Sequence, residues 1–447
     1  MQKIAIIGAG SAIFSLNLIK DICLCENLKD STISLMDVNQ DRLDAITDLC
    51  IRYAKETGHG LQIEKTSDRR KALKNADFVV NVALDYGHDR LREGWDIAYR
   101  NGYRFGGSLH IVHDEAFWVN WHQMRLMESI LQDVLEICPT AWYVLVANPV
   151  LAGVTYLKRK YPQANIVGMC HGFGGVYGLA KVLGLEKKKL SFECVGVNHF
   201  VWLTKLYHNG EDALPQIRDW VDTKSTEYFK TCNISDGNGP KAVDLYKRFG
   251  VFPIGDTCTP GGGSWGWWYH TDQEESYWNE DPKTWYEGYF KSGIEQVEKI
   301  RQVVADKSVS VMDAFSSIPS DEPMVPLIEA LAYDTERIVI VNILNTGSLV
   351  PGIPEDFEVE VPALISKKGI QGIRTDGLPS DIMTYLWRDR IANVEMELIA
   401  YETGKLERLV DLVMNDPWTK SRGQAEALVE EILNLPCNSS MKTYFGN

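Results

Sequence analysis

The sequence predicts an α/β protein in which a Rossmann-type N-terminal domain, residues 1–190, is followed by an α+β domain, residues 191–447. Three observations predict this arrangement. A short apolar run ends in a glycine-rich turn, further apolar runs alternate with helical stretches, and the pattern changes near residue 190. The chain has 447 residues, of which 45% are hydrophobic, so it can bury a large core and divide into two domains.

The first element is an apolar strand over residues 4–7, which runs into the glycine turn Gly8–Ile13 and then into a stretch with helical spacing. A second strand, Thr32–Met36, ends at Asp37, which lies 24 residues after Ile13. In dinucleotide-binding proteins, glycines let the backbone approach the pyrophosphate at a helix N-terminus, and such an acid binds the ribose hydroxyls. Ile13 stands where a third glycine is usual. The alternative is a doubly wound domain without a cofactor. We expect a nicotinamide-type cofactor to contact the turn, the acid and the end of a later strand: Gly8, Gly10, Ser11, Ala12, Ile13, Asp37 and Asn81.

Two later apolar runs, residues 77–82 and 142–146, predict buried parallel strands that each follow a helical stretch. In an open parallel sheet, the carboxyl ends of the strands face the ligand crevice. Asn148 follows the second run, so we expect it to touch substrate or nicotinamide. The alternative is that Asn148 only shapes the turn before the next residue, a proline.

A further short strand over residues 164–169 delivers Cys170 and His171 at its end. His199 opens the second domain, 29 residues after Cys170. A thiolate and an imidazole that meet at a domain junction could share a divalent metal and leave positions open for a substrate. The alternative is a buried cysteine that only packs, which is the more usual role of this residue.

Two acidic residues, Asp114 and Asp256, lie in loop or glycine-rich contexts. Loop carboxylates of this kind are candidates for proton transfer, and the alternative is a helix N-cap or a turn. The segment after Asp256 is rich in glycine, and it holds three tryptophans suited to stacking on a sugar ring: Trp265, Trp267 and Trp268. Residues 379–435 predict amphipathic helices that supply core and a candidate subunit interface.

The chain carries 46 basic and 61 acidic residues, a formal net charge of −15, and the acidic residues are spread along it. Such a surface repels phosphate backbones and anionic membranes, so we expect neither nucleic acid nor membrane as a partner. The nine cysteines show no disulfide framework, and no apolar stretch approaches the roughly 18 residues of a membrane helix. We expect a cytoplasmic protein.

Taken together, these segments resemble the family 4 glycoside hydrolases, glycosidases that need both NAD and a divalent metal. The resemblance covers nearly the whole chain and is carried by short motifs: Gly8–Ser11, Ala147–Val150, Cys170–Gly172, Val197–Phe200, Gly255–Asp256, and Asn345–Gly347 through Glu360–Ala363. It implies a second domain of the lactate/malate dehydrogenase C-terminal type, NAD and Mn²⁺ or another divalent metal as cofactors, and a homodimer or homotetramer.

The resemblance also implies roles for individual residues. Cys170 and His199 correspond to the metal ligands of the family, and Asp256 corresponds to the base of the members that use aspartate. Asp114 is expected to be the acid, although its surroundings depart from the Gly-Asp-Thr stretch common in the family. Two further residues are expected to hold the substrate: Asn148 and His171.

The residues after Cys170 vary with the substrate in this family, and here they read His171-Gly172-Phe173, which looks like the α-glucuronidase branch. A glutamate in place of Gly172 would repel a uronic acid carboxylate, whereas glycine removes both charge and bulk. The predicted substrate is therefore a small α-linked uronide. Within the family, α-galacturonides, α-glucosides and α-galactosides stay open. Two arginines could pair with the carboxylate: Arg92 and Arg104.

The chemistry implied by the resemblance is redox-assisted elimination. Oxidation of the sugar at C3 with NAD makes the C2 proton acidic, Asp256 removes that proton, and the leaving group departs from C1 with protonation by Asp114. Water then adds, and return of the hydride regenerates NAD. More distant alternatives are an NAD-dependent 2-hydroxy acid dehydrogenase, which would need no Cys/His metal pair, and a non-catalytic NAD-sensing protein.

Overall fold

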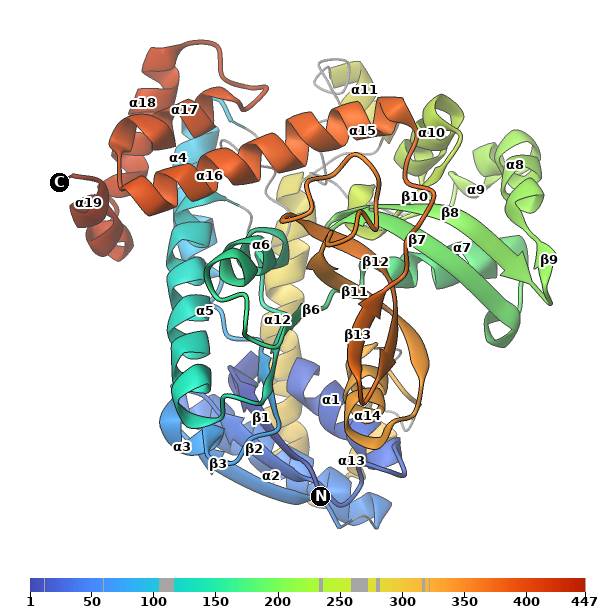
Figure 1. The fold of residues 1–447 in the computed structure, drawn as a ribbon, viewed down its shortest axis with the longest axis vertical. Helices are drawn as coiled ribbons and strands as arrows, with labels where there is room; N and C mark the ends of the chain where they lie inside the picture. Colours follow the sequence, from blue (N-terminus) through green and yellow to red (C-terminus); the bar gives the residue numbers. More distant parts are fainter. Residues whose placement is uncertain are drawn as a thin grey trace.

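The computed structural model describes residues 1–446 except 12, 59, 104–115, 233–235, 259–271, 279–281, 316–317 and 321. Its 13 described strands form one sheet, with β13 and β9 pairing at its side and the others in the order β10-β8-β7-β12-β11-β6-β5-β4-β1-β2-β3 (Figure 1). Their bounds are β1 Lys3–Ile7, β2 Thr32–Met36, β3 Gln62–Thr66, β4 Phe78–Asn81, β5 Trp142–Leu145, β6 Ile166–Gly168, β7 Leu190–Val197, β8 Phe200–His208, β9 Glu211–Asp212, β10 Phe252–Ile254, β11 Arg337–Leu344, β12 Glu358–Ser366 and β13 Gly369–Gly372.

The parallel half of the sheet, β3-β2-β1-β4-β5-β6, has the strand order of a Rossmann domain. Its strands other than the edge strand β3 are buried on both faces. In β1, Ile4 and Ile6 enter the apolar cluster that contains α1 and α2, while Ala5 and Ile7 enter the cluster that contains α5 and α6. This alternation explains why the strands read as continuous apolar runs in the sequence.

The antiparallel half begins where β11 pairs with β6, at Asn342 opposite Gly168. From there the order continues through β12, β7, β8 and β10, so the end of β6 lies beside strands from the far end of the chain. β7 and β8 form a hairpin whose connecting loop is two residues, Asn198 and His199. The chain therefore combines a parallel dinucleotide-type unit with an antiparallel α+β unit, as the sequence predicted. The domain bounds at residue 190 stay a prediction, because the sheet runs through this point.

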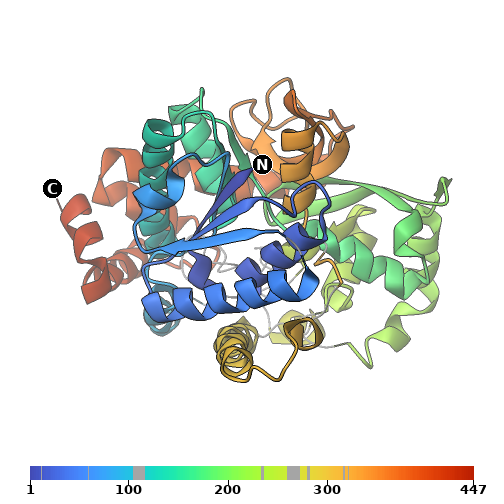
Figure 2. The same cartoon turned by 90° about the horizontal axis from the view of Figure 1, so that it is seen from below.

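Helices cover both faces of the parallel strands. Figure 2 shows α2 along one face with α12 outside it, and Figure 1 shows α15 and α16 crossing above the sheet toward the C-terminal helices. The helices are α1 Ile13–Leu24, α2 Gln40–Thr57, α3 Arg69–Leu73, α4 Asp89–Arg100, α5 Phe117–Ile137, α6 Val150–Lys160, α7 Gly175–Leu183, α8 Leu214–Thr223, α9 Ser225–Tyr228, α10 Pro240–Phe249, α11 Asp272–Trp278, α12 Pro282–Ala305, α13 Val311–Phe315, α14 Met324–Tyr333, α15 Ser380–Leu386, α16 Ala392–Thr403, α17 Leu406–Met414, α18 Arg422–Leu433 and α19 Ser439–Phe445.

Short helical turns complete the fold. They are η1 Ala9–Ser11, η2 Gly172–Gly174, η3 Lys187–Lys189, η4 Gly255–Thr257, the π-turn η6 Trp387–Ile391 and η7 Pro436–Asn438. Of these, η1 carries the predicted site residues Gly10 and Ser11, and η4 carries Asp256. Among the described helices, none combines the length and apolarity needed to cross a lipid bilayer.

Candidate active site at the carboxyl ends of the parallel strands

The glycine turn after β1 has the close backbone contacts that a dinucleotide site requires. Gly8 has φ +90°, and a Cβ atom there would lie 2.4 Å from the Cα of Ala83 after β4. A Cβ on Gly10 would lie 2.7 Å from the Oδ2 of Asp37. The Gly10 N–H donates a hydrogen bond of 2.7 Å to this same Oδ2. Position 8 thus requires glycine, whereas a side chain at position 10 would displace the Asp37 carboxylate, so the acid at the end of β2 contacts the turn directly.

The turn leads to the N-terminus of α1, whose first turn contains no acidic side chain. Ser11, exposed at the end of η1, donates its N–H to the Gly8 carbonyl. A helix N-terminus whose own first turn carries no acidic side chain favours a bound anion such as a pyrophosphate. Ala12 lies outside the described residues, as does the side chain of Ile13, which begins α1. The predicted cofactor contacts of this turn stay predictions.

Asn81 and Asn148 lie at the carboxyl ends of the neighbouring strands β4 and β5. Asn81 is fully buried, and its amide is engaged within the fold: Nδ2 donates to the Tyr143 hydroxyl at 2.8 Å, and Oδ1 accepts from the Ala83 N–H at 3.1 Å. Asn148 is half-buried and precedes a cis peptide bond to Pro149. Asn148 is therefore better placed than Asn81 to offer its side chain to a ligand, and both ligand contacts stay predictions.

Three side chains meet where β6, the β7–β8 hairpin and η4 come together. One potential ligand atom each from Cys170, His199 and Asp256 lies within 4.8 Å of the other two. The His199 Nε2 is 3.4 Å from the Asp256 Oδ2, and the two side chains are only 3% and 14% exposed. A thiolate, an imidazole and a carboxylate form a donor set that suits a divalent transition metal or zinc and leaves coordination positions open. The structure thus brings together the two residues predicted as ligands and the residue predicted as base.

Backbone geometry explains how these side chains meet. His199 has φ +59° in the two-residue loop of the hairpin, a conformation that costs free energy for any residue other than glycine. Gly255 also has φ +59°, and a Cβ there would lie 2.5 Å from the carbonyl oxygen of Gly172. This contact places Asp256 beside Cys170. Thr257 fixes η4 further, because its hydroxyl accepts from the Val201 N–H at 2.7 Å and donates to the Val201 carbonyl at 2.9 Å.

The electrostatic setting of Cys170 opposes a free thiolate. Burial raises the pKa of the Cys170 thiol well above its usual value, and the nearby charges of Glu360 and Asp256 raise it further. The Gly172 N–H donates to Sγ at 3.3 Å, which acts in the opposite direction. A divalent cation would supply the positive charge that a buried thiolate lacks, so the site suits a bound metal better than a reactive free cysteine.

His171 lies at the rim of this cluster. Its side chain is 44% exposed, and its Nδ1 is 3.6 Å from the Oε2 of Glu322. Burial raises the pKa of the Glu322 carboxyl, and the charge of Asp21 does so as well, whereas His171 lowers it. An exposed imidazole next to the metal-ligand candidates can meet a substrate hydroxyl, and the substrate role of His171 stays a prediction.

Sequence reasoning gave no role to the polar residues behind the cluster. Glu358 and Glu360 on β12 hydrogen-bond to Asn198, and the Arg390 Nη2 donates to the His199 carbonyl at 3.2 Å. The signal in the sequence that could have indicated them was a pair of glutamates at alternate positions within an apolar run, because burying carboxyl groups costs free energy unless neighbouring groups compensate them.

Asp114 and the three tryptophans of the glycine-rich segment lie outside the described residues: Trp265, Trp267 and Trp268.

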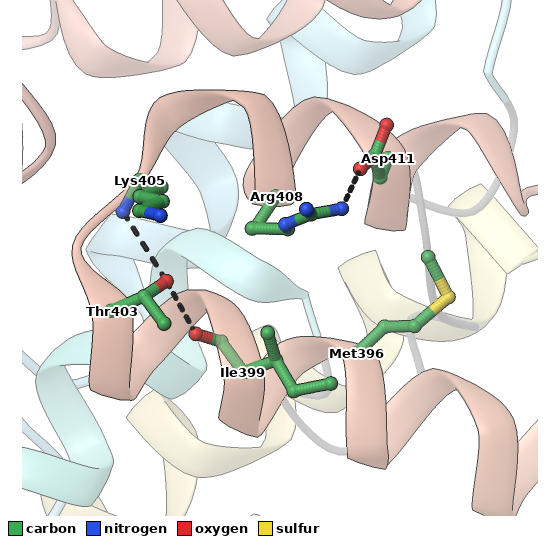
Figure 3. Close-up of a pocket in the computed structure, with 6 residues that line it drawn as sticks. All are labelled: Met396, Ile399, Thr403, Lys405, Arg408 and Asp411. Atoms are coloured by element: carbon green, nitrogen blue, oxygen red, sulfur yellow. Dashed lines mark hydrogen bonds and ion pairs between the residues drawn. The ribbon is translucent and has the colours of Figure 1, made fainter.

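The described part of the chain also has a pocket of ≈ 400 Å³ on α16 and α17 (Figure 3). Thr403 donates to the Ile399 carbonyl and Arg408 pairs with Asp411 along its rim. None of the predicted site residues lines this pocket, so it adds nothing to the assignment of the active site. Its lining is Met396, Ile399, Thr403, Lys405, Arg408 and Asp411.

The structure thus combines a dinucleotide-type glycine turn after β1 with a Cys/His/Asp cluster that includes Cys170, just after β6. The family model for the family 4 glycosyl hydrolases matches residues 3–185, and that for the C-terminal domain of the same family matches residues 194–419. The chain belongs to this family and is a glycosyl hydrolase, which confirms the resemblance found in the sequence.

Curated relatives differ in the sugar that they act on. The chain is 25% identical over 440 residues to an α-galactosidase of Bacillus subtilis, covering 97% of this chain and 96% of that one. It is 25% identical over 472 residues to an α-galacturonidase of Lachnoclostridium phytofermentans, covering 97% and 95%. Over 409 residues it is 28% identical to an α-glucosidase of Erwinia rhapontici, covering 84% and 85%. The family therefore includes relatives that act on a uronide and relatives that act on neutral sugars.

Solved structures confirm the fold class. A 6-phospho-α-glucosidase from gut microorganisms, solved in complex with NAD and Mn²⁺, superposes with a TM-score of 0.80 at 19% identity, covering 98% of each chain. A malate dehydrogenase from Cryptosporidium parvum superposes with a TM-score of 0.52 at 15% identity, covering 90% of this chain and 99% of that one. The second comparison agrees with a Rossmann domain followed by a domain of the malate dehydrogenase C-terminal type.

Proposed function

We propose that this protein is an NAD- and divalent-metal-dependent α-glucuronidase that removes a terminal uronic acid from small α-linked uronides. The observation that carries the proposal is the cluster of Cys170, His199 and Asp256, in which Cys170 comes just after the parallel strand β6 as the glycine turn comes just after the parallel strand β1. A glycosidase that works by two carboxylates alone has no use for either a thiol ligand or a dinucleotide turn. Similarity to a family member solved with NAD and Mn²⁺ supports the same cofactors here.

The residues present fit both groups. The backbone of Gly8 and Gly10 and the N-terminus of α1 would hold the pyrophosphate, and Asp37 would hold the ribose. Cys170 and His199 would hold the metal, with Mn²⁺ as the expected ion. When bound, NAD supplies reversible hydride acceptance at C3 of the sugar, and the cation supplies polarisation of the C3 oxygen.

The chain's own residues then account for the proton transfers. Asp256 is 14% exposed, more than His199 at 3%, and its carboxylate can take the proton from C2 once C3 is oxidised. Asn148 and His171 orient the sugar hydroxyls from the ends of β5 and β6. Asp114 is proposed to protonate the leaving group. Because the hydride returns to the product, the cofactor is needed only in catalytic amount.

The choice of a uronide rests on position 172. A Cβ atom on Gly172 would lie 3.5 Å from the Cys170 Sγ, which is an ordinary contact, so the fold itself tolerates a side chain there. A carboxylate at this position would add negative charge beside the metal-ligand candidates and repel an anionic substrate. Similarity to an α-galacturonidase makes α-galacturonides the second candidate substrate.

The test compares aryl α-glucuronide, α-galacturonide and α-glucoside with purified protein, NAD, Mn²⁺ and a reductant. The proposal predicts release of the uronic acid, with at least tenfold lower kcat/KM for the neutral glucoside. The Gly172→Glu variant should lose most activity on uronides and less on the neutral glycoside, and Gly172→Ala serves as its uncharged control. Hydrolysis of the neutral α-glucoside without release of any uronic acid would contradict the substrate assignment.

A second measurement separates the glycosidase from a dehydrogenase. Absorbance of NADH should show no net rise while sugar is released, because the cofactor is regenerated in each turnover. Stoichiometric accumulation of NADH without cleavage of the glycosidic bond would identify an oxidoreductase instead.

Location and assembly form part of the proposal. All nine cysteines are free thiols in the structure, the state that a reducing cytoplasm maintains. We propose a cytoplasmic homodimer or homotetramer, to be checked by light scattering coupled to size-exclusion chromatography.

A further inference from the structure

Two glutamates lie at the beginning of β12, as its first and third residues, where the fold would be expected to bury only apolar side chains. Glu358 and Glu360 are 0% and 1% exposed. They occupy alternate positions of the strand and therefore point to the same face of the sheet. Burying two carboxyl groups side by side is unfavourable unless neighbouring groups compensate them, so their surroundings indicate what they do.

Both glutamates bind one neighbouring loop and one neighbouring strand. The Asn342 Nδ2 on β11 donates to the Glu358 Oε1 at 2.7 Å and to the Glu360 Oε2 at 2.9 Å. The Asn198 N–H donates to the Glu358 Oε2 at 3.2 Å, and the Asn198 Nδ2 donates to the Glu360 Oε2 at 3.2 Å. Among the described residues, no donor reaches the Glu360 Oε1, although this atom is buried.

Asn198 is the first residue of the two-residue loop that presents His199. The second residue, His199, has φ +59°, so the loop needs outside contacts to hold this conformation. Glu358 fixes the backbone of the loop, Glu360 fixes the Asn198 side chain, and Arg390 binds the His199 carbonyl. All three contacts come from residues more than 150 positions further along the chain.

We propose that Glu358 and Glu360 are positioning residues of the metal site, which hold the Asn198–His199 loop so that the imidazole faces Cys170 and Asp256. Glu360 also places negative charge behind the three ligand candidates, and this charge favours a bound cation. Partners that orient metal ligands typically change metal affinity by 10- to 100-fold when they are removed. The inference rests on the proposed metal ligation by Cys170 and His199.

The experiment measures Mn²⁺ affinity of the full-length protein by equilibrium dialysis and by the electron paramagnetic resonance of free and bound Mn²⁺. Glu360→Ala is expected to raise the Kd for Mn²⁺ by about 10- to 100-fold. Glu360→Gln keeps one acceptor oxygen and the size of the side chain but loses the charge, and it is expected to raise the Kd several-fold. The glutamine variant keeps the measurement possible if the alanine variant does not fold.

A matched control is available on α16. Glu397 is 4% exposed and accepts two hydrogen bonds from the Asn120 Nδ2, at 3.0 and 3.1 Å. Glu397→Ala and Glu397→Gln remove a buried carboxylate–amide contact that does not involve the His199 loop. They should lower the Tm as the Glu360 variants do but leave the Kd for Mn²⁺ unchanged.

The outcomes distinguish the inference from the proposed function. If Cys170→Ser abolishes Mn²⁺ binding while folded Glu360→Ala and Glu360→Gln bind as tightly as wild type, the metal site stands and the positioning role is overturned. If Cys170→Ser binds Mn²⁺ like wild type, the proposed metal site fails and the inference fails with it. A Kd that rises in the Glu360 variants but not in the Glu397 variants supports the inference.

Discussion

Gly255 is the residue at which fold and site depend on each other most directly, and Gly255→Ala tests that dependence. The substitution has two costs. A residue other than glycine with φ +59° costs about 1–2 kcal/mol. The new Cβ would also lie 2.5 Å from the Gly172 oxygen and 2.8 Å from the Gly172 Cα, backbone atoms that cannot rotate away. Overpacking of this kind costs about 1–3 kcal/mol.

Gly250 provides the control because it has φ +72° and a Cβ atom there would meet nothing within 4 Å, so Gly250→Ala has the conformational cost alone. Urea denaturation should show Gly255→Ala less stable than Gly250→Ala by about 1–3 kcal/mol. The strain is relieved if η4 moves away from η2, which carries Asp256 away from Cys170. A displacement of about 1 Å should lower kcat/KM about 100-fold.

Equal free energies of unfolding for the two alanine variants, together with wild-type activity of Gly255→Ala, would refute this reasoning. That result would mean that the contact between Gly172 and Gly255 does not hold Asp256 in place.

Three further predictions concern the cofactor turn, the base and the stability of the fold. Gly10→Ala should raise the Kd for NAD at least tenfold, measured by calorimetry, because its Cβ would lie 2.7 Å from the Asp37 Oδ2; an unchanged Kd would remove the turn from the cofactor site. Asp256→Asn should lower kcat by about 10²–10⁴-fold without weakening NAD binding, and a loss of less than tenfold would exclude Asp256 as the base. Burial lowers the pKa of His122 to about 4, and the charge of Arg90 does so as well. The folded protein keeps this ring neutral while the unfolded chain protonates near pH 6.5, so stability falls by about 3 kcal/mol between pH 7 and pH 4. Denaturation curves of His122→Gln should lack this share of the pH dependence; identical slopes for both proteins would contradict it.

The sequence predicted the fold well where local pattern decides it. The strand predicted over Thr32–Met36 is β2 to the residue, because this largely apolar run is buried on the sheet. The glycine turn was readable because glycines at this spacing directly after an apolar strand form a local pattern, although the residues that the turn contacts, Ala83 and Asp37, lie further along the chain.

The site was less readable because it is assembled from distant parts of the chain. Spacing alone could not show that Cys170 meets His199, since their contact depends on the pairing of β6 with β11 and of β12 with β7. The same long-range pairing brings Glu360 to the back of the site. Resemblance to the family supplied the pairing of the two ligands, but it gave no role to the buried glutamates.

The central claim is that cleavage proceeds through removal of the C2 proton and not by direct displacement at C1. The most direct test is hydrolysis of an α-glucuronide in D₂O with NAD and Mn²⁺, followed by NMR of the released sugar. The account predicts deuterium at C2 of the product, because the proton taken by Asp256 exchanges with solvent before it is replaced. Complete turnover with no deuterium at C2 would contradict it.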